Sequence, residues 1–492
     1  MTRAIAAAGE TRHAYVRWLA ALFLLSLFLI NPWVRGDGVG YYAYARSVLI
    51  DHNLQFVKDW RSANPSFQLF RLDASGNPLP GSYTRTGHLD NHFSVGPAIL
   101  WAPVLMVVNG AVRTLDHFGA HIPADGYSRP YLVAMALTTA GYGFLGLLLS
   151  FGIARKFAGA GCAFLATLGI WWASPLPVYM YFNPSWSHAQ SAFTAALFLW
   201  YWERTRGTRS LGQWMLLGLM AGLAANVYYP NALFVLAPMI ETLAALRAKS
   251  SAGAPRTVSL ARIARDWIAF AAVFAVSLLP TFITRQIIYG SPLASGYPPV
   301  STWNWTSPVL FQVLFSSDHG LLSWTPILVP SLVGLVILWK RDRILGGSLC
   351  AIALAYYYFI ASYVDWDGIS SFGNRFFVSL TPIFVIGLSV FLAKLAEWIG
   401  SRPRAWAAAG VLVGLSIVWN VGFMFQWGTH LVPARGEFSW REMVRNQFTV
   451  VPQSMAQECE MYLFRRRSMM QRIEQQDTDQ LRAHPSGALP AQ

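Results

Sequence analysis

The residue of this chain best placed to do chemistry is an acid that directly follows the first long apolar run. Asp37 lies in GDGVGYYAYARSVLIDHNLQF, residues 36–56. A carboxylate just beyond the end of a membrane span can meet a water-borne substrate while a lipid-borne substrate lies beside it. Alternatively, Asp37 caps a short helix by accepting backbone N–H bonds. Gly38 and Gly40 weaken this alternative, because glycines destabilise a first helical turn and instead allow close backbone approach.

The rest of this stretch predicts a short amphipathic helix. Residues at three- and four-residue spacings share one side of a helix, which here holds Tyr41, Tyr44, Val48 and Leu49. Such a helix would lie along the membrane surface and present Asp37 at its start.

Other polar residues are expected at the same face of the membrane, at the outer ends of the spans. The span centres hold almost no charges, whereas transporters and ion pathways need charged groups there. Each residue could also be an interfacial cap or part of a solvated loop. Arg375 stands out, because the short outer loops carry two basic residues, Arg285 and Arg375. The outer polar set comprises His88, Asp90, Asn91, His92, Asn183, Ser185, Ser187, His188, Tyr228, Tyr229, Asn231, Asp318, His319, Asp365, Asp367, Asn374 and Arg375.

The composition is that of a polytopic membrane protein. Of 492 residues, 54% are hydrophobic and 12% are charged, against about 25% charged in typical soluble domains. The net charge of +14 therefore concerns membrane topology, and we expect no nucleic-acid partner. The three cysteines, Cys162, Cys350 and Cys459, have no spacing that predicts a disulfide framework or a metal site.

Apolar runs of membrane-spanning length recur along the whole chain and predict an all-α protein with about eleven transmembrane helices. A further apolar run at 93–112 could be a twelfth. The predicted spans are 16–33, 129–154, 157–178, 186–203, 211–227, 231–247, 266–284, 320–339, 345–364, 376–396 and 406–427.

The distribution of basic residues favours an interfacial position for residues 93–112. If this run does not cross, nineteen Lys and Arg residues share the inner side of the membrane, as the positive-inside rule requires. If it crosses, the asymmetry is reversed. We therefore expect a transmembrane domain over 1–427, with a long first periplasmic loop at 34–128 that carries interfacial helices. The tail at 428–492 is then periplasmic, partly amphipathic and disordered at its end.

These motifs resemble the C-type glycosyltransferases, integral-membrane enzymes that use polyprenyl-phosphate sugars. The likeness is greatest to the bacterial branch around the protein O-mannosyltransferases and the lipid A aminoarabinose transferase. It rests on an acid after the first span, a long first outer loop and a train of further spans. The matching stretches are GDGVGYYAYAR, HFSVGPAILWAP, NPSWSHAQSAF, FSSDHGLLSWTP and SFGNRFF.

The resemblance implies a mechanism. Asp37 would be the general base on an acceptor hydroxyl, which attacks the anomeric carbon of the lipid-linked sugar with inversion. Arg375 would stabilise the leaving lipid phosphate. The hydrogen-bond donors would be His92, His188 and His319, and Tyr41 and Tyr42 would line the sugar or acceptor groove.

The chain also departs from the family. Many relatives carry a second acid beside the first, and here Asp90 is the candidate. A lysine that contacts phosphate in some relatives is absent from HFSVGP, which leaves that role to His92, Arg375 or another group. A metal ion is not certain from the sequence, although a divalent metal is possible in this family.

The expected partners are a polyprenyl-phosphate-linked sugar, an acceptor glycan, lipid or protein, and the membrane lipid itself. We expect a bacterial inner-membrane protein of the cell envelope, with its site facing the periplasm. Two alternatives stay open, a lipid-linked glycan flippase or transporter and an O-antigen-type ligase or polymerase. Proximity of Asp37 and Arg375 in one outer cavity would favour the glycosyltransferase.

Overall fold

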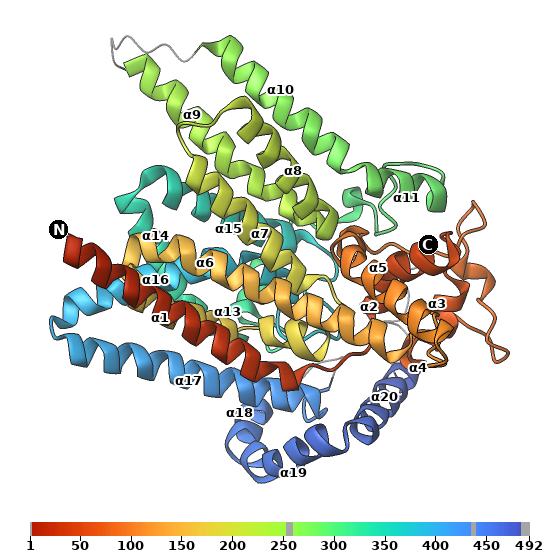
Figure 1. Ribbon diagram of the computed structural model, residues 1–492. Coiled ribbons are helices and arrows are strands. Elements are labelled where there is room, and N and C mark those ends of the chain that lie inside the picture. Colours follow the sequence, from red (N-terminus) through yellow and green to blue (C-terminus); the bar gives the residue numbers. More distant parts are fainter. Residues whose placement is uncertain (1, 252–258, 434–438, 484–492) are drawn as a thin grey trace.

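The computed structural model describes residues 2–251, 259–433 and 439–483. In this part of the chain the secondary structure is helical apart from two isolated bridges, Leu72 with Pro78 and Tyr83 with Leu89. Figure 1 shows long helices running alongside one another, with short helices and loops gathered at one end. The all-α class expected from the sequence is confirmed.

Six described helical stretches are long and apolar enough to cross a membrane, or up to seven if the bent pair α10 and α11 forms one span. The number eleven is therefore not confirmed, although every predicted range overlaps at least one helix. The predicted spans 129–154 and 157–178 correspond to two helical segments of α6, which meet at a kink at Gly159, where φ is 76°. The six stretches are α5 (Gly96–His117), α6 (Arg129–Trp172), Tyr229–Arg247 in η5 (Tyr229–Val235) and α9 (Leu236–Ser251), α15 (Arg343–Ser362), Arg375–Ile399 in η7 (Arg375–Leu380) and α16 (Thr381–Ile399), and α17 (Arg402–Gly428).

The remaining helices of the bundle are shorter, bent or, in the case of α1, apolar over only part of its length. They are α1 (Thr2–Ser26), η1 (Leu27–Leu29), η4 (Val178–Phe182), α7 (His188–Thr205), α8 (Leu211–Val227), α10 (Leu260–Ser277), α11 (Leu279–Tyr289), η6 (Val300–Thr302), α12 (Leu310–Phe315), α13 (Leu321–Trp324) and α14 (Leu328–Arg341).

Helix α16 is buried over its first half and packs against α6 and α14. Small residues let the helices approach closely. A Cβ on Gly334 of α14 would lie 1.8 Å from the carbonyl oxygen of Gly387 on α16. Close packing of small residues is a main source of helix association in membranes, where the hydrophobic effect does not drive it. The helix that begins just after Arg375 is thereby held at a fixed position.

The region between α1 and α6 forms a second, smaller core. It contains α2 (Asp37–Arg46), the π-helix η2 (Ser47–Asp51), α3 (Val57–Arg61), α4 (Pro65–Gln68), η3 (Pro80–Ser82) and α5. The amphipathic character expected of α2 is wrong, because every residue from Gly38 to Arg46 is buried. The 91–93 segment, α5 and the loop before α6 enclose α2, so aromatic residues on both sides of the helix pack inward.

The apolar run 93–112 forms most of α5, which packs against α2, α6 and α8. Pro103 lies inside the continuous helix, and Gly96 and Pro97 form its first turn. By length and composition α5 could cross a membrane. Its interfacial position stays a prediction that rests on the charge asymmetry.

The C-terminal part forms three helices, α18 (Trp440–Phe448), α19 (Val450–Phe464) and α20 (Arg466–Ala483). Figure 1 shows α20 beside α4, at the end of the bundle that holds the short helices. The segment 484–492, which we expect to be disordered, lies outside the described residues.

Candidate functional site

The first residue of α2, Asp37, is paired with Arg375. A carboxylate oxygen of Asp37 accepts a hydrogen bond of 2.5 Å from Nη1 of Arg375. Asp37 is not the N-cap, because Gly36 precedes it in that position with φ 52° and without a side-chain cap bond. The structure therefore brings together the two residues on which the sequence argument depends.

Close packing of backbone segments positions this pair. A Cβ on Gly38 would lie 1.9 Å from Oγ of Ser185, so the start of α2 can meet the turn before α7 because residue 38 is glycine. From the same turn, the Trp186 ring lies 4.6 Å from the Arg375 guanidinium carbon. The Trp186 indole N–H donates to the Arg35 carbonyl. The turn thus orients Arg375 and also fixes the segment that leads to Asp37.

The guanidinium of Arg375 has donor capacity to spare. Its side chain is 10% exposed, and its Nε has no hydrogen-bond partner among the described residues. Nδ1 of His188, whose ring packs against Tyr179 and Trp186, likewise has no partner there. Buried donors without partners are costly, and a phosphate oxygen is a ligand that would satisfy them.

A second polar group lies beside Arg375. Asp318, His319 and Asp367 each offer a ligand atom, and these atoms lie within 4.8 Å of one another. Burial lowers the pKa of His319 to about 3, so its imidazole is neutral, as a metal ligand must be. A Cβ on Gly368 would lie 3.2 Å from Nε of Arg375. The loop that carries Asp367 and Gly368 therefore lies against the Arg375 guanidinium. Two carboxylates and an imidazole suit a divalent metal ion, so these residues could hold one.

The sequence did not identify this group as a unit. Asp367 is far from Asp318 and His319 along the chain. Each was visible as a polar residue at an outer span end, but their spacing does not match a metal motif.

Asp90 and His92 lie in different surroundings, whereas the Tyr41 hydroxyl interacts with Ser187, Asp37 and Arg375. Asp90 accepts a hydrogen bond from the Tyr289 hydroxyl and lies 3.4 Å from His92. Tyr41 is buried against Phe93.

Tyr42, which we expected in the substrate groove, is part of the smaller core between α1 and α6. Its hydroxyl donates to the Gly126 carbonyl at 2.6 Å, and its ring packs on Trp101 and Tyr127.

Asp37 also lines a cavity of about 590 Å³, a volume typical of ligand sites. The cavity lies between the segment after α1, the end of α17 and the C-terminal helices. Of the eight predicted site residues, Asp37 is the one that lines it. Sequence reasoning missed the contribution of Arg35 and of the tail, whose amphipathic pattern was the available sign of a buried face.

Comparison with known proteins places the fold. No family model matches the chain, and no curated protein matches it. Among solved structures, ArnT from Cupriavidus metallidurans in the apo state is 14% identical, with 94% of this chain and 74% of that chain covered and a TM-score of 0.51. The archaeal oligosaccharyltransferase AglB from Archaeoglobus fulgidus, in complex with an inhibitory peptide and a dolichol-phosphate, is 13% identical with a TM-score of 0.47; the match covers 94% of this chain and 56% of that chain. The chain is therefore an integral membrane protein with the fold of the C-type glycosyltransferases.

Proposed function

We propose that this protein transfers a sugar from a polyprenyl-phosphate carrier to an acceptor at the outer face of the membrane. The observation that carries the proposal is the contact between Asp37 and Arg375 beside the cavity. A proton acceptor and an anion-binding guanidinium are what such a transfer needs at one place. The fold shared with ArnT is consistent with this chemistry.

In the proposed reaction, Asp37 accepts the proton of an acceptor hydroxyl as its oxygen attacks the anomeric carbon of the donor sugar. The bond from that carbon to the phosphate oxygen breaks with inversion, and the electron pair leaves with the lipid phosphate. General-base assistance is typically worth about 10²–10⁴-fold.

We assign Arg375 two roles, one toward the Asp37 carboxylate and one toward the leaving phosphate. One nitrogen already donates to Asp37, and the buried Nε has no hydrogen-bond partner among the described residues, so we assign the spare donor capacity of this guanidinium to an oxygen of the leaving phosphate. Charge-assisted hydrogen bonds of this kind stabilise developing negative charge in a site that excludes water. His188, with its own unpartnered nitrogen, is the second donor that we assign to the phosphate or the sugar.

A flippase or transporter of lipid-linked glycans is the alternative from a different class. Such a protein would need charged groups near the middle of its spans. The buried span that follows Arg375 has no further charged residue until Lys394. A ligase or polymerase of lipid-linked glycans would share the chemistry proposed here and differ in the acceptor.

Two experiments test the proposal. In the first, the purified protein in vesicles is supplied with a polyprenyl-phosphate sugar. In the second, the cell-envelope glycans of cells with and without the gene are compared by mass spectrometry. We expect loss of one sugar from one class of envelope glycan, lipid or protein when the gene is removed. We also expect release of polyprenyl phosphate by the purified protein. Movement of an intact lipid-linked glycan across the vesicle membrane, without cleavage of the sugar–phosphate bond, would overturn the proposal.

A further inference from the structure

The C-terminal helices form a wall of the cavity that contains Asp37. The opposite wall comes from the segment after α1 and from the end of α17. The tail residues that line the cavity include Met455, Cys459, Tyr462, Met469, Met470 and Asp477.

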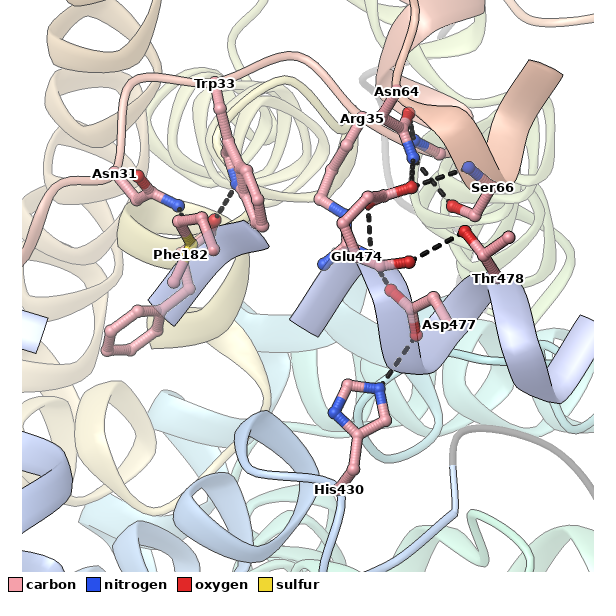
Figure 2. A network of polar contacts seen from close by, with 12 residues as sticks. Asn31, Trp33, Arg35, Asn64, Ser66, Phe182, His430, Glu474, Asp477 and Thr478 are labelled. Atoms are coloured by element: carbon pink, nitrogen blue, oxygen red, sulfur yellow. Dashed lines mark hydrogen bonds and ion pairs between the residues drawn. The ribbon is translucent and has the colours of Figure 1, made fainter. Parts of the chain in front are cut away.

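A polar network joins α20 to the segment after α1 and to the segment just after α17 (Figure 2). Asp477 pairs with Arg35 and accepts a hydrogen bond of 2.8 Å from Nε2 of His430, which lies just after α17. One turn earlier, Glu474 accepts bonds from the Asn64 side chain at 2.8 Å and from the Ser66 backbone at 2.6 Å. Because Arg35 lies two residues before Asp37, the tail is fastened to the segment that carries the proposed base.

A second set of contacts joins α19 and α20 to the end of the first span. The Tyr462 hydroxyl donates to the Leu29 carbonyl at 2.5 Å, and Arg466 donates to the Phe28 carbonyl at 2.9 Å. Carbonyls at the end of a helix lack intrahelical partners, so the tail satisfies groups that would otherwise need water. These bonds make the tail a built part of the wall.

The cavity surface is mostly apolar, and its charged lining residues include Asp37, Arg35 and Asp477. The tail contributes Met455, Met469 and Met470, which are unbranched, flexible side chains that adapt to irregular apolar ligands. On α19 beside the cavity, Phe464 is 80% exposed, as expected of a residue that contacts membrane hydrocarbon.

We infer that this cavity holds the phosphate-proximal part of the donor's isoprenoid chain and that the helical pair α19–α20 is the wall that seats it. The inference rests on the proposed function. The apolar surface receives the chain, and the phosphate lies at the end where Asp37 and Arg375 meet. Seating the chain against a fastened wall holds the sugar–phosphate bond beside the base.

Cys459 provides a direct test, because it lines the cavity and is exposed. In a Cys162→Ala and Cys350→Ala background, it is the one cysteine left in the chain. A maleimide should label it, and polyprenyl phosphate should slow that labelling at least fivefold. Inorganic phosphate and a straight-chain phosphatidic acid should not. No protection by polyprenyl phosphate, or equal protection by phosphatidic acid, would overturn the inference.

Two matched substitutions on α19 separate the inference from the proposed function. Cys459→Trp fills the cavity, whereas Ala456→Trp adds the same ring at an exposed position that does not line it. We expect Cys459→Trp to raise the KM for the lipid-linked donor at least tenfold and Ala456→Trp to leave it unchanged. Protection without any sugar transfer would refute the proposed function and keep the lipid site. Transfer with neither protection nor a KM effect would refute the lipid site.

Discussion

The two ends of helix α2 each carry one member of an acid–arginine pair, and the two pairs differ in what surrounds them. At the C-terminal end, Arg46 donates to Asp59 at 3.1 Å and to the Asp125 carbonyl. Asp59 is fully buried and also accepts a bond of 2.8 Å from the Tyr127 hydroxyl. At the N-terminal end, Asp37 is 30% exposed and faces a cavity.

This difference separates a structural pair from a functional one. The pair of Arg46 and Asp59 makes its hydrogen bonds inside the protein. The pair of Arg375 and Asp37 keeps an unpartnered Nε and an accessible carboxylate. Buried charged pairs are costly to break but need not stabilise the fold, so we expect one pair to govern stability and the other to govern reaction rate.

The largest expected effect on stability is at the satisfied pair. Arg46→Met removes the main counter-charge of Asp59 and should lower the free energy of unfolding by about 3–5 kcal/mol, measured by thermal unfolding in detergent. Transfer per folded molecule should be unchanged. Lys58→Met is the control, because Lys58 is 67% exposed in its pair with Asp51 and should cost less than about 1 kcal/mol. Equal effects of the two changes would contradict the distinction.

The pH dependence of stability should report the same pair. Burial raises the pKa of Asp59 from 3.8 to about 6, more than Arg46 lowers it. The folded protein then holds the proton more tightly than the unfolded chain, so this contribution to stability is lost as pH rises through that range. Relative to Asp59→Asn, the free energy of unfolding of the wild type should fall by roughly 3 kcal/mol as the pH rises from the lower of these two pKa values to the higher. Parallel pH profiles of stability would show that Asp59 does not titrate there.

A smaller effect, on kinetics alone, is expected at the open pair. Arg375→Lys keeps the charge and loses the planar set of donors, so the donor KM should rise by about 10-fold, equivalent to about 1.4 kcal/mol. The unfolding midpoint should stay close to that of the wild type. A contrasting variant is Arg285→Lys, because Arg285 donates to the carbonyls of Asn91, His92 and Phe93 and should affect stability instead. A silent Arg375→Lys would remove Arg375 from phosphate binding.

Much of the fold could be predicted from apolar run lengths, and the meeting of Asp37 with Arg375 followed from their shared place at outer span ends. The burial of α2 on all sides could not be predicted from the sequence, because the residues that cover it come from α5 and from the loop before α6. Hydrophobic spacing reports one helix at a time and does not show which later segments cover it.

The position of the C-terminal helices at the cavity also could not be predicted from the sequence. Their amphipathic pattern indicated a buried face without indicating the partner. Pairing of Asp477 with Arg35 depends on α20 returning to the segment after α1, and no local pattern encodes that return. The same holds for Asp318, His319 and Asp367, which meet only in the folded chain.

The central claim is that Asp37 takes a proton during sugar transfer, and the most direct measurement is the transfer rate of Asp37→Asn in vesicles, scored against folded protein. Asparagine keeps the size of the side chain and can accept the Arg375 hydrogen bond, but it cannot act as a base. Asp116→Asn, which changes an exposed acid on α5, is the control. We predict a loss of roughly 10²-fold or more for Asp37→Asn and a normal rate for Asp116→Asn. Near-normal transfer by a well-folded Asp37→Asn protein would contradict the assignment of the base.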